Sequence, residues 1–342
     1  MHGTRPTLRD VARLSGVSEI SVSRVMRNAP NISEKLRERV EQAARQLGYT
    51  PNRLAGGLKS QSSNLVAVVV PSMGNNVFPE VVDEIDRILT GHGRRMVLGL
   101  TQYDIQREEA VLRDLMSWSP SGLILTGLEH TEASRALLAQ ARIPVVEIMD
   151  IDRPPGQSAP LGTVIGVSHH AAGAAMADHL LARGYRRIGY VGAWGESDIR
   201  SLKRRQGFEA RLAERGMALA ARHVAPEASS IGLGRQACAR ILEAEPQIDA
   251  LFFANDDLAV GGLLHCLAAG IAVPDRLALA GFNGIGFADA MPQRLTTIRT
   301  PRARMGALAA ETLLGQGAGT AAGAEPGAVI DLGFSLLARE TS

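Results

Sequence analysis

The chain has 342 residues, 45% of them hydrophobic and 21% charged, which is the composition of an ordinary globular protein with room for about two domains and a small module. No run approaches about 18 apolar residues, and the N-terminus MHGTRPTLRD lacks an apolar signal core, so we expect a cytoplasmic protein without membrane contact. The net charge is only +2, yet residues 1–60 carry eleven Lys and Arg against five Asp and Glu. A basic head on a mildly acidic remainder indicates a polyanion as the partner of the head alone.

Two short helices joined by a tight turn are predicted close to the N-terminus. Thr7 can cap the first helix, with Asp10 near its positive end, and Gly16 suits the positive φ of a helix end. Ser18 can cap the second helix, which covers residues 19–26. Apolar positions at helical spacing are expected to form one face of the first helix: Leu8, Val11, Ala12 and Leu14. Helix, glycine-containing turn and helix form the unit whose second helix enters the major groove of DNA.

A third helix is predicted after a polar loop, with Ser33 as its cap and Gly48 at its end. Apolar residues of the three helices can close a miniature core: Leu8, Val11, Val22, Val25, Leu36, Val40 and Leu47. Because such a core is small, the module is expected to be only marginally stable alone.

The run TLRDVARLSGVSEISVSRVM, the helix NISEKLRERVEQAARQLG and the following YTPNRLAGGLK together resemble the head of the lactose-repressor (LacI/GalR) family of bacterial transcription regulators. A chance match to a generic helix-turn-helix would not include the third helix and the YTPN segment as well. The resemblance implies that Glu19, Ile20 and Arg24 meet base edges. An arginine suits guanine, a glutamate the amino group of cytosine, and an isoleucine a thymine methyl.

The same resemblance implies roles for further positions of the head. Residues placed for phosphate contacts are Thr7, Ser18, Ser23 and Asn28. Residues 52–59 resemble a hinge helix that forms on DNA and inserts a leucine, here Leu58, into the minor groove. The expected DNA contacts of this hinge are Asn52, Arg53, Ala55 and Leu58.

This chain departs from the family at the hinge, where Gly56 and Gly57 replace better helix formers. Each glycine costs up to about 1 kcal/mol of helix stability relative to alanine. We therefore expect a hinge that orders only on DNA and at a higher cost. Unchanged operator affinity in a Gly56→Ala/Gly57→Ala variant would contradict this interpretation.

Beyond a polar joint at residues 61–63, apolar runs alternate with helical patterns, which predicts parallel sheets covered by helices. The first series has expected strands at 65–70, 96–100, 122–126 and 145–149 and helices at 80–92, 106–118 and 132–141. The second has expected strands at 163–167, 187–191, 250–253 and 277–280 and helices at 171–183, 199–215, 234–245 and 258–269. A strand at 294–298, a helix at 302–315 and strands near 329–337 would cross back between two lobes.

The predicted fold class is therefore a three-helix helix-turn-helix head with a hinge helix, followed by a periplasmic-binding-protein-like α/β core of two Rossmann-like lobes. We expect the head and hinge over residues 1–60 and the effector-binding and dimerisation core over residues 61–342. Within the core, lobe 1 is expected over about 64–162 plus 295–325 and lobe 2 over about 163–293 plus 326–342.

The resemblance extends over the core, which in this family is similar to periplasmic sugar-binding proteins. Ligands of open α/β sheets bind at the carboxyl ends of the strands, so we expect the effector in the segments that follow them. Arg204 matches the family arginine that clamps ligand oxygens, and Asn255 matches an NDxxA contact. The expected effector-binding residues are Ser72, Asn76, Phe78, Thr126, Glu147, Asp150, Arg204, Asn255 and Asn283.

A sugar acid is the expected effector. Many sugar-binding members have an aspartate where Asn283 stands, and losing that carboxylate while keeping Arg204, with Lys203 and Arg205 adjacent, suits an anionic polyol. Segments such as IPVVEIMD, FFANDDLAVG and LTTIRTPRARMG also resemble the gluconate-repressor branch. We expect gluconate, a related sugar acid or its phosphate, with a neutral sugar as the alternative. Glu147 argues against an anionic effector, since a carboxylate near such a ligand must pair with a cation or face a hydroxyl group of the ligand.

Two other classes of protein, an enzyme and a transport receptor, fit the sequence less well. An enzyme could use His169, His170 and Asp178 as a metal or acid–base cluster, but adjacent histidines at a helix start point in different directions. Neither G-x-G-x-x-G nor G-x-x-x-x-G-K-[ST] occurs, and Cys238 and Cys266 are expected to be buried thiols without the spacing of a zinc site. A transport receptor would need a signal peptide and would lack the basic head. We expect that the protein is not an enzyme and that it binds no metal and no cofactor, only a small-molecule effector.

The resemblance implies a repressor that binds a pseudo-palindromic double-stranded DNA operator as a homodimer in the nucleoid. Effector closure of the lobes would shift the dimer interface and the spacing of the hinges. By linkage, DNA must weaken effector binding by the factor by which effector weakens DNA binding. We expect an inducer rather than a co-repressor, and a dimer rather than a tetramer because no heptad tail follows the last strand.

Overall fold

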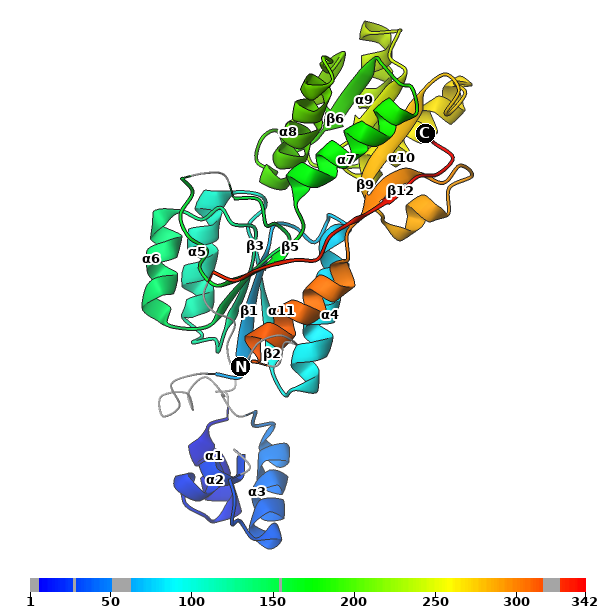
Figure 1. Ribbon diagram of the computed structural model, residues 1–342. Helices are drawn as coiled ribbons and strands as arrows, with labels where there is room; N and C mark the ends of the chain where they lie inside the picture. Colours follow the sequence, from blue (N-terminus) through cyan, green and yellow to red (C-terminus); the bar gives the residue numbers. More distant parts are fainter. Residues whose placement is uncertain (1–5, 27–28, 51–62, 154–155, 316–326) are drawn as a thin grey trace. The chain divides into compact units, whose positions relative to one another are not determined.

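The computed structural model describes residues 6–26, 29–50, 63–153, 156–315 and 327–342. The chain divides into two compact units, Met1–Ser63 and Asn64–Ser342, and each is described by itself (Figure 1). None of the helices in the described ranges has the length and apolarity needed to cross a membrane. The expected DNA contacts and hinge glycines that lie outside the described residues are Asn28, Asn52, Arg53, Ala55, Gly56, Gly57 and Leu58.

The described residues of the first unit form three helices: α1 (Leu8–Ser15), α2 (Glu19–Met26) and α3 (Glu34–Leu47). The Thr7 hydroxyl accepts from the N–H of Asp10 at 3.3 Å, and the Asp10 carboxylate accepts from the N–H of Thr7 at 2.9 Å, which makes a capping box. Gly16 ends α1 with a φ of 64°. The Ser18 hydroxyl accepts from the N–H of Ser21 at 3.2 Å in the first turn of α2. The predicted helix-turn-helix and its caps are confirmed.

The core of this unit contains residues of all three helices, as expected: Val11, Ala12, Val22, Val25, Val40, Ala43 and Ala44 are buried. Two local expectations are wrong. Leu14 is 49% exposed, because two residues after Ala12 a helix has turned by about 200°. Ser33 precedes α3 but its hydroxyl makes no capping hydrogen bond.

The second unit contains two lobes, each with a six-stranded sheet. The first sheet has the order β11-β5-β4-β3-β1-β2, and all of its neighbouring strands are parallel. Its strands are β1 (Leu65–Val70), β2 (Arg95–Leu100), β3 (Leu123–Thr126), β4 (Val145–Ile148), β5 (Thr163–Gly166) and β11 (Val329–Asp331). Its helices are α4 (Val77–Gly91), α5 (Ile105–Met116), α6 (Glu132–Ala141) and α11 (Arg302–Leu313). Val68 packs with α4 and α11 and Val69 with α5 and α6, because successive strand residues point to opposite faces. These two pairs of helices lie on opposite faces of the sheet (Figure 1).

The second sheet has the order β12-β10-β9-β8-β6-β7 and is parallel except for the β10–β12 pair. Its strands are β6 (Ile188–Gly192), β7 (Ala221–Val224), β8 (Ala250–Phe253), β9 (Ala278–Asn283), β10 (Thr296–Arg299) and β12 (Ser335–Leu337). Its helices are α7 (His169–Ala182), α8 (Ile199–Glu214), α9 (Ile231–Ala244), α10 (Asp256–Ala269) and the 3-10 turn η1 (Gly286–Asp289). The Phe252 ring packs on Phe208 of α8 with centroids 4.9 Å apart, whereas Phe253 faces Gly262 of α10. Cys238 and Cys266 are buried and free, as expected.

The chain passes between the lobes three times, which corrects the expected lobe boundaries. β5 lies in the first sheet, so the first crossing follows this strand instead of preceding it. β10 lies in the second sheet before α11 returns to the first lobe, and β11 pairs with β5 before β12 enters the second sheet. Buried parallel strands all have similar apolar sequences, so the apolar pattern does not show to which of the two sheets a strand belongs. The sequence does not predict β7, whose Arg222 and His223 interrupt any apolar run.

Candidate functional site

A cavity that is open to solvent lies between the two lobes of the second unit. Its walls follow the carboxyl ends of strands in both sheets, where ligands of open α/β folds bind. The first lobe contributes Phe78, Tyr103 and Met149, and the second contributes Asn255 and Phe282.

Five helices begin at the edge of this cavity. The lining includes Phe78 in the first turn of α4, His169 at the first position of α7, and the residues that cap α8 and α10, Asp198 and Asn255. Thr300 lines it just before α11. Helix N-termini carry partial positive charge and unpaired N–H groups, so their convergence favours an anionic or oxygen-rich ligand.

Arg204 of α8 reaches the cavity from the second lobe and is buried. Its Nη1 donates to Nδ1 of His169 at 2.9 Å and its Nη2 donates to the carbonyl of Ala254 at 2.8 Å. The guanidinium lies 4.0 Å from the ring centroid of Phe282, a cation–π contact. Its Nε is buried without a hydrogen-bond partner among the described residues. An unpaired buried donor is costly, so the Nε of Arg204 is available to donate a hydrogen bond to an acceptor atom of a ligand.

His169 is a neutral imidazole in this arrangement. Burial, together with the Arg204 guanidinium, lowers the pKa of His169 well below its ordinary value. Its Nδ1 therefore accepts from Arg204, and its Nε2 donates to the carbonyl of Met149 at 2.9 Å. His170, the next residue, is exposed, so the two histidines do point in different directions.

A second arginine, Arg200, lies one helical turn before Arg204 and lines the same cavity with a side chain that is 9% exposed. Its guanidinium lies 5.8 Å from the ring centroid of Phe78 and 5.9 Å from that of Tyr103. Asp198 is its ion-pair partner, at 3.9 Å. Because His169 is neutral, the lining has two positive side chains and one carboxylate, an excess of positive charge.

Two asparagines lie in the wall formed by the second lobe. The Oδ1 of Asn255 accepts from the N–H of Leu258 at 3.1 Å and caps α10. Asn283 ends β9 with a φ of 116°, a conformation that L-residues rarely adopt, and its carbonyl accepts from Arg302. Strain of this kind persists only where the surroundings hold the backbone in place.

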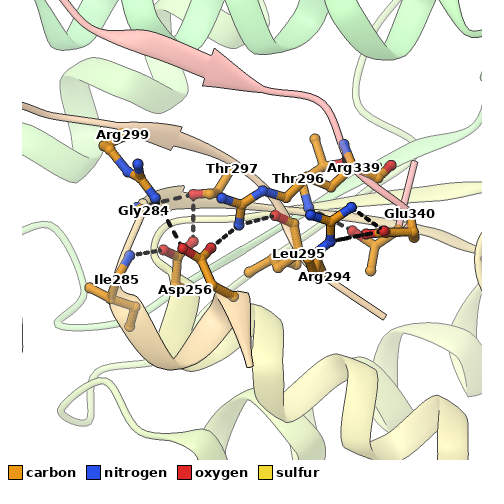
Figure 2. A network of polar contacts seen from close by, with 12 residues as sticks. Asp256, Gly284, Ile285, Arg294, Leu295, Thr296, Thr297, Arg299, Arg339 and Glu340 are labelled. Carbon is orange, nitrogen blue, oxygen red and sulfur yellow. Dashed lines mark hydrogen bonds and ion pairs between the residues drawn. The ribbon is translucent and has the colours of Figure 1, made fainter. Parts of the chain in front are cut away.

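The carboxylate of Asp256 holds the segment that follows Asn283. It accepts from the N–H of Ile285 at 2.9 Å and from the hydroxyl of Thr297 at 2.6 Å (Figure 2). Burial raises the pKa of Asp256 to about 7, although these hydrogen bonds act in the opposite direction. Outward along the same network, Arg294 and Glu340 form an ion pair at 2.6 Å (Figure 2). The network fixes the loop that presents Asn283 to the cavity.

The structure brings four of the nine expected effector residues to the cavity: Phe78, Arg204, Asn255 and Asn283. Five others do not line it: Ser72, Asn76, Thr126, Glu147 and Asp150. The Ser72 hydroxyl accepts from the N–H of Gly74 at 3.0 Å, and the Thr126 hydroxyl donates to the carbonyl of Val69 at 3.0 Å. Asn76 donates to Asp257 at 2.9 Å.

The two expected acids are turned away from the cavity by partners of their own. Glu147 accepts from the N–H groups of Leu161 at 2.7 Å and Gly162 at 3.2 Å, and Asp150 pairs with Lys203. This removes the objection that Glu147 raises against an anionic ligand.

The expectation that Lys203 and Arg205 add positive charge beside the ligand is also wrong. Lys203 pairs with acids of the first lobe, and Arg205 pairs with Glu196 at 3.4 Å and Glu209 at 3.5 Å. Adjacent helix residues are about 100° apart, so neither can share the face of Arg204.

Six polar residues that line the cavity are not among the nine expected effector residues: Asn75, Tyr103, His169, Asp198, Arg200 and Thr300. Helical spacing could have identified Arg200, because residues four apart share a face. Tyr103 carries no such signal, since its position depends on packing against Trp194 of the other lobe, with ring centroids 4.6 Å apart. In the described ranges, no group of three or more His, Cys, Asp or Glu is arranged to hold a metal ion.

In the first unit, the expected base-reading residues lie on the exposed side of α2. Ile20 is 74% exposed and the Glu19 side chain is 56% exposed. Arg24 lies one turn after Ile20 and is also exposed, whereas Val22 and Val25 face the core. A large apolar side chain held in solvent at the start of a recognition helix suits contact with a base methyl. Of the expected phosphate contacts, Thr7 and Ser18 are exposed and Ser23 is half-buried.

The fold and the cavity together define a ligand-responsive DNA-binding regulator. Residues 7–52 match the model described as bacterial regulatory proteins, lacI family, and residues 177–342 match a periplasmic binding protein-like domain. The HTH-type transcriptional regulator GntR of Pseudomonas aeruginosa is 40% identical over 339 residues, covering 99% of this chain and 96% of that protein. The chain therefore belongs to the lacI family, and this match supports the gluconate-repressor branch expected from the sequence.

Two solved structures are similar over nearly the whole chain. A LacI family transcriptional regulator from Silicibacter pomeroyi is 42% identical with a TM-score of 0.89, covering 98% of this chain and 99% of that one. The lac repressor dimer bound to operator and the anti-inducer ONPF is 25% identical with a TM-score of 0.78, covering 99% of each chain. The protein is thus a DNA-binding transcription regulator with a core of the type that binds small sugar-like effectors.

Proposed function

We propose that the effector is a sugar acid such as gluconate, whose carboxylate binds between Arg200 and Arg204. The observation that carries this proposal is the unpaired Nε of the buried Arg204 beside a second arginine of the same helix face. Arginine donors match the geometry of a carboxylate, and bonds between charged groups are about twice as strong as neutral ones. Asp198, the one carboxylate among the described residues of the lining, also accepts from the N–H of Ser201 and leaves the positive excess in place.

The remaining lining suits a polyol chain. Asn255 and Asn283 offer amide donors and acceptors for hydroxyl groups, while Phe78, Tyr103 and Phe282 supply apolar surface for the carbon side. The relative named GntR supports this class of effector. The protein would act in the cytoplasm as a repressor and would catalyse no reaction. It would bind a pseudo-palindromic operator as a homodimer and release the operator when the effector binds. The likeness to an operator-bound lac repressor dimer supports this assembly.

Calorimetric titration of the full chain with gluconate, sorbitol and glucose tests the effector class. We expect gluconate to bind more tightly than either neutral compound, and Arg200→Met to weaken gluconate by at least about tenfold, as expected for a hydrogen bond to a charged group. Arg205→Met is the matched control, because its side chain is also 9% exposed but pairs with glutamates outside the cavity. Glucose binding without gluconate binding would overturn the proposal.

Operator release is measured separately. Binding of the full chain to a labelled operator fragment should weaken as gluconate is added, and the titrating species should have the mass of a dimer. Tighter operator binding with gluconate would identify a co-repressor response instead.

A further inference from the structure

We propose that Lys203 is a positioning residue of the effector site, whose ammonium group ties α8 of the second lobe to Glu129 and Asp150 of the first and so holds the lobes together around the cavity. Only the identity of the effector rests on the function proposed above; the tie rests on geometry.

The contacts of Lys203 all reach the first lobe. Its Nζ lies 2.7 Å from Oε1 of Glu129 and 2.5 Å from Oδ2 of Asp150, and it donates to the carbonyl of Asp152 at 2.6 Å. Glu129 follows β3, and Asp150 and Asp152 follow β4. An ammonium group has three donors, and here all three are satisfied by oxygen atoms from the opposite lobe.

Because its members are buried, removal of one partner of this contact costs more than removal of one partner of a surface ion pair. The Lys203 side chain is 10% exposed and that of Asp150 is fully buried. Burial alone would lower the pKa of Lys203, but Asp150 and Glu129 raise it above its ordinary value, so the ammonium stays charged. Removing one member of a buried ion pair leaves the other charge without compensation, which is strongly unfavourable. A separation of the lobes would break all three contacts at once.

The position of Lys203 on α8 couples this tie to the ligand. Lys203 precedes Arg204, which bonds to His169, and follows Arg200, whose guanidinium faces Phe78 and Tyr103 of the first lobe. Arg200 and Arg204 share one face of α8 and Lys203 points to another, so the tie fixes the position of the helix that carries both arginines. Because apparent affinity falls with the fraction of molecules in the binding-competent form, loss of the tie weakens effector binding without touching the cavity.

The fluorescence of Trp194 can measure contact between the lobes independently of effector binding. Its ring packs against Tyr103 across the two lobes, with centroids 4.6 Å apart. The chain has two tryptophans, and Trp118 is 42% exposed on the first lobe. In a Trp118→Phe background, Trp194 emission therefore reports on lobe contact in the absence of any ligand.

The experiment compares Lys203→Met with Arg205→Met in the full-length Trp118→Phe chain. The two side chains are close in sequence, similarly buried and both ion-paired, but Arg205 pairs with Glu196 and Glu209 of its own lobe. We expect Lys203→Met to shift the ligand-free Trp194 emission to the red and to weaken gluconate binding on the order of tenfold, a typical coupling factor. Arg205→Met should leave both quantities within about twofold of the parent. Lys203→Arg, which keeps the charge and reach, should restore most of the affinity.

Each outcome decides the proposal. Parental emission and affinity in folded Lys203→Met would overturn it, and so would equal losses in Lys203→Met and Arg205→Met. If Lys203→Met does not fold, Glu129→Gln removes one acceptor more gently, and an unchanged emission and affinity in that variant would also overturn it. If the parent does not bind gluconate at all, the effector assignment fails, while the red shift of Trp194 in Lys203→Met alone still decides the tie.

Discussion

Nη1 of Arg204 donates a hydrogen bond to Nδ1 of His169 at 2.9 Å, so the position of one of the two cations of the cavity depends on an imidazole that stays neutral. Because burial holds the pKa of His169 well below that of the unfolded chain, this histidine contributes stability above about pH 6.5. The contribution is lost as the pH falls below that value, by up to about 1.4 kcal/mol per pH unit. We expect His169→Gln to reduce the loss of melting temperature between about pH 7 and 5.5. His170→Gln, at an exposed position, should keep the parental slope; an equal slope in both variants would contradict the assignment.

His130 should give a pH dependence of opposite sign. Its Nδ1 lies 2.8 Å from Glu108, and its Nε2 lies 3.3 Å from Glu147 without hydrogen-bond geometry. Burial alone would lower the pKa of His130, but the two glutamates raise it to about 9. The folded pKa lies above the unfolded one, so the stabilisation is complete below about pH 6.5 and is lost as the pH rises through about 9. The urea concentration at the midpoint of unfolding should therefore decrease as the pH rises from about 6.5 to about 9.

His130→Gln provides the comparison for that measurement. The substitution should abolish the alkaline slope and destabilise the fold by about 3–5 kcal/mol, because two buried carboxylates lose their cation. His92→Gln is the control, since His92 is exposed. A parental slope in His130→Gln would show that another group causes it.

The capping box of α1 should matter for DNA binding through the stability of the first unit. Thr7→Ala removes the hydroxyl that accepts from Asp10 and should cost about 1 kcal/mol. In a unit with so small a core, this loss should lower its melting temperature and weaken operator binding. Thr7→Ser retains the hydroxyl and should behave as the parent in thermal unfolding. Equal behaviour of the two variants would contradict a capping role.

Arg24 should determine specificity at one base pair. Arg24→Ala should cost about 1–3 kcal/mol of operator affinity and relax the preference at a single position, if Arg24 makes the bidentate contact to guanine that the family resemblance predicts. Arg45→Ala serves as the control, since Arg45 is an exposed residue of α3 paired with Glu41. Titration of operators substituted at each base pair measures both effects; a uniform loss at all positions would indicate a phosphate contact instead.

Gly281 should be required for effector binding although it does not line the cavity. A Cβ at this position would lie 2.3 Å from Oδ1 of Asp256, the carboxylate that holds the loop after Asn283. Gly281→Ala should cost about 1–3 kcal/mol of stability through overpacking and also weaken gluconate binding. Gly286→Ala is the matched control, because nothing lies within 4 Å of its added Cβ. If Gly281→Ala binds gluconate as tightly as the parent does, the loop after Asn283 does not position the effector site.

The sequence by itself determined what depends on neighbours along the chain. The capping box of Thr7, the turn at Gly16 and the buried strands such as β1 and β8 follow from local pattern, because caps, turns and apolar runs act over a few residues. The motif of the head likewise follows from the sequence alone, since its residues are contiguous.

Only the tertiary structure decided which strand ends meet and which side chains face the cavity. The boundaries expected from the sequence place β5, β10 and β11 in the wrong lobes, because pairing between distant strands leaves no local mark. Glu147 and Asp150 lie at a strand end as the site residues do, yet buried partners turn them away, while Arg200 and Tyr103 enter through helix face and packing. The physical reason is that a buried charge takes the direction of its nearest partner, and that partner comes from another part of the chain.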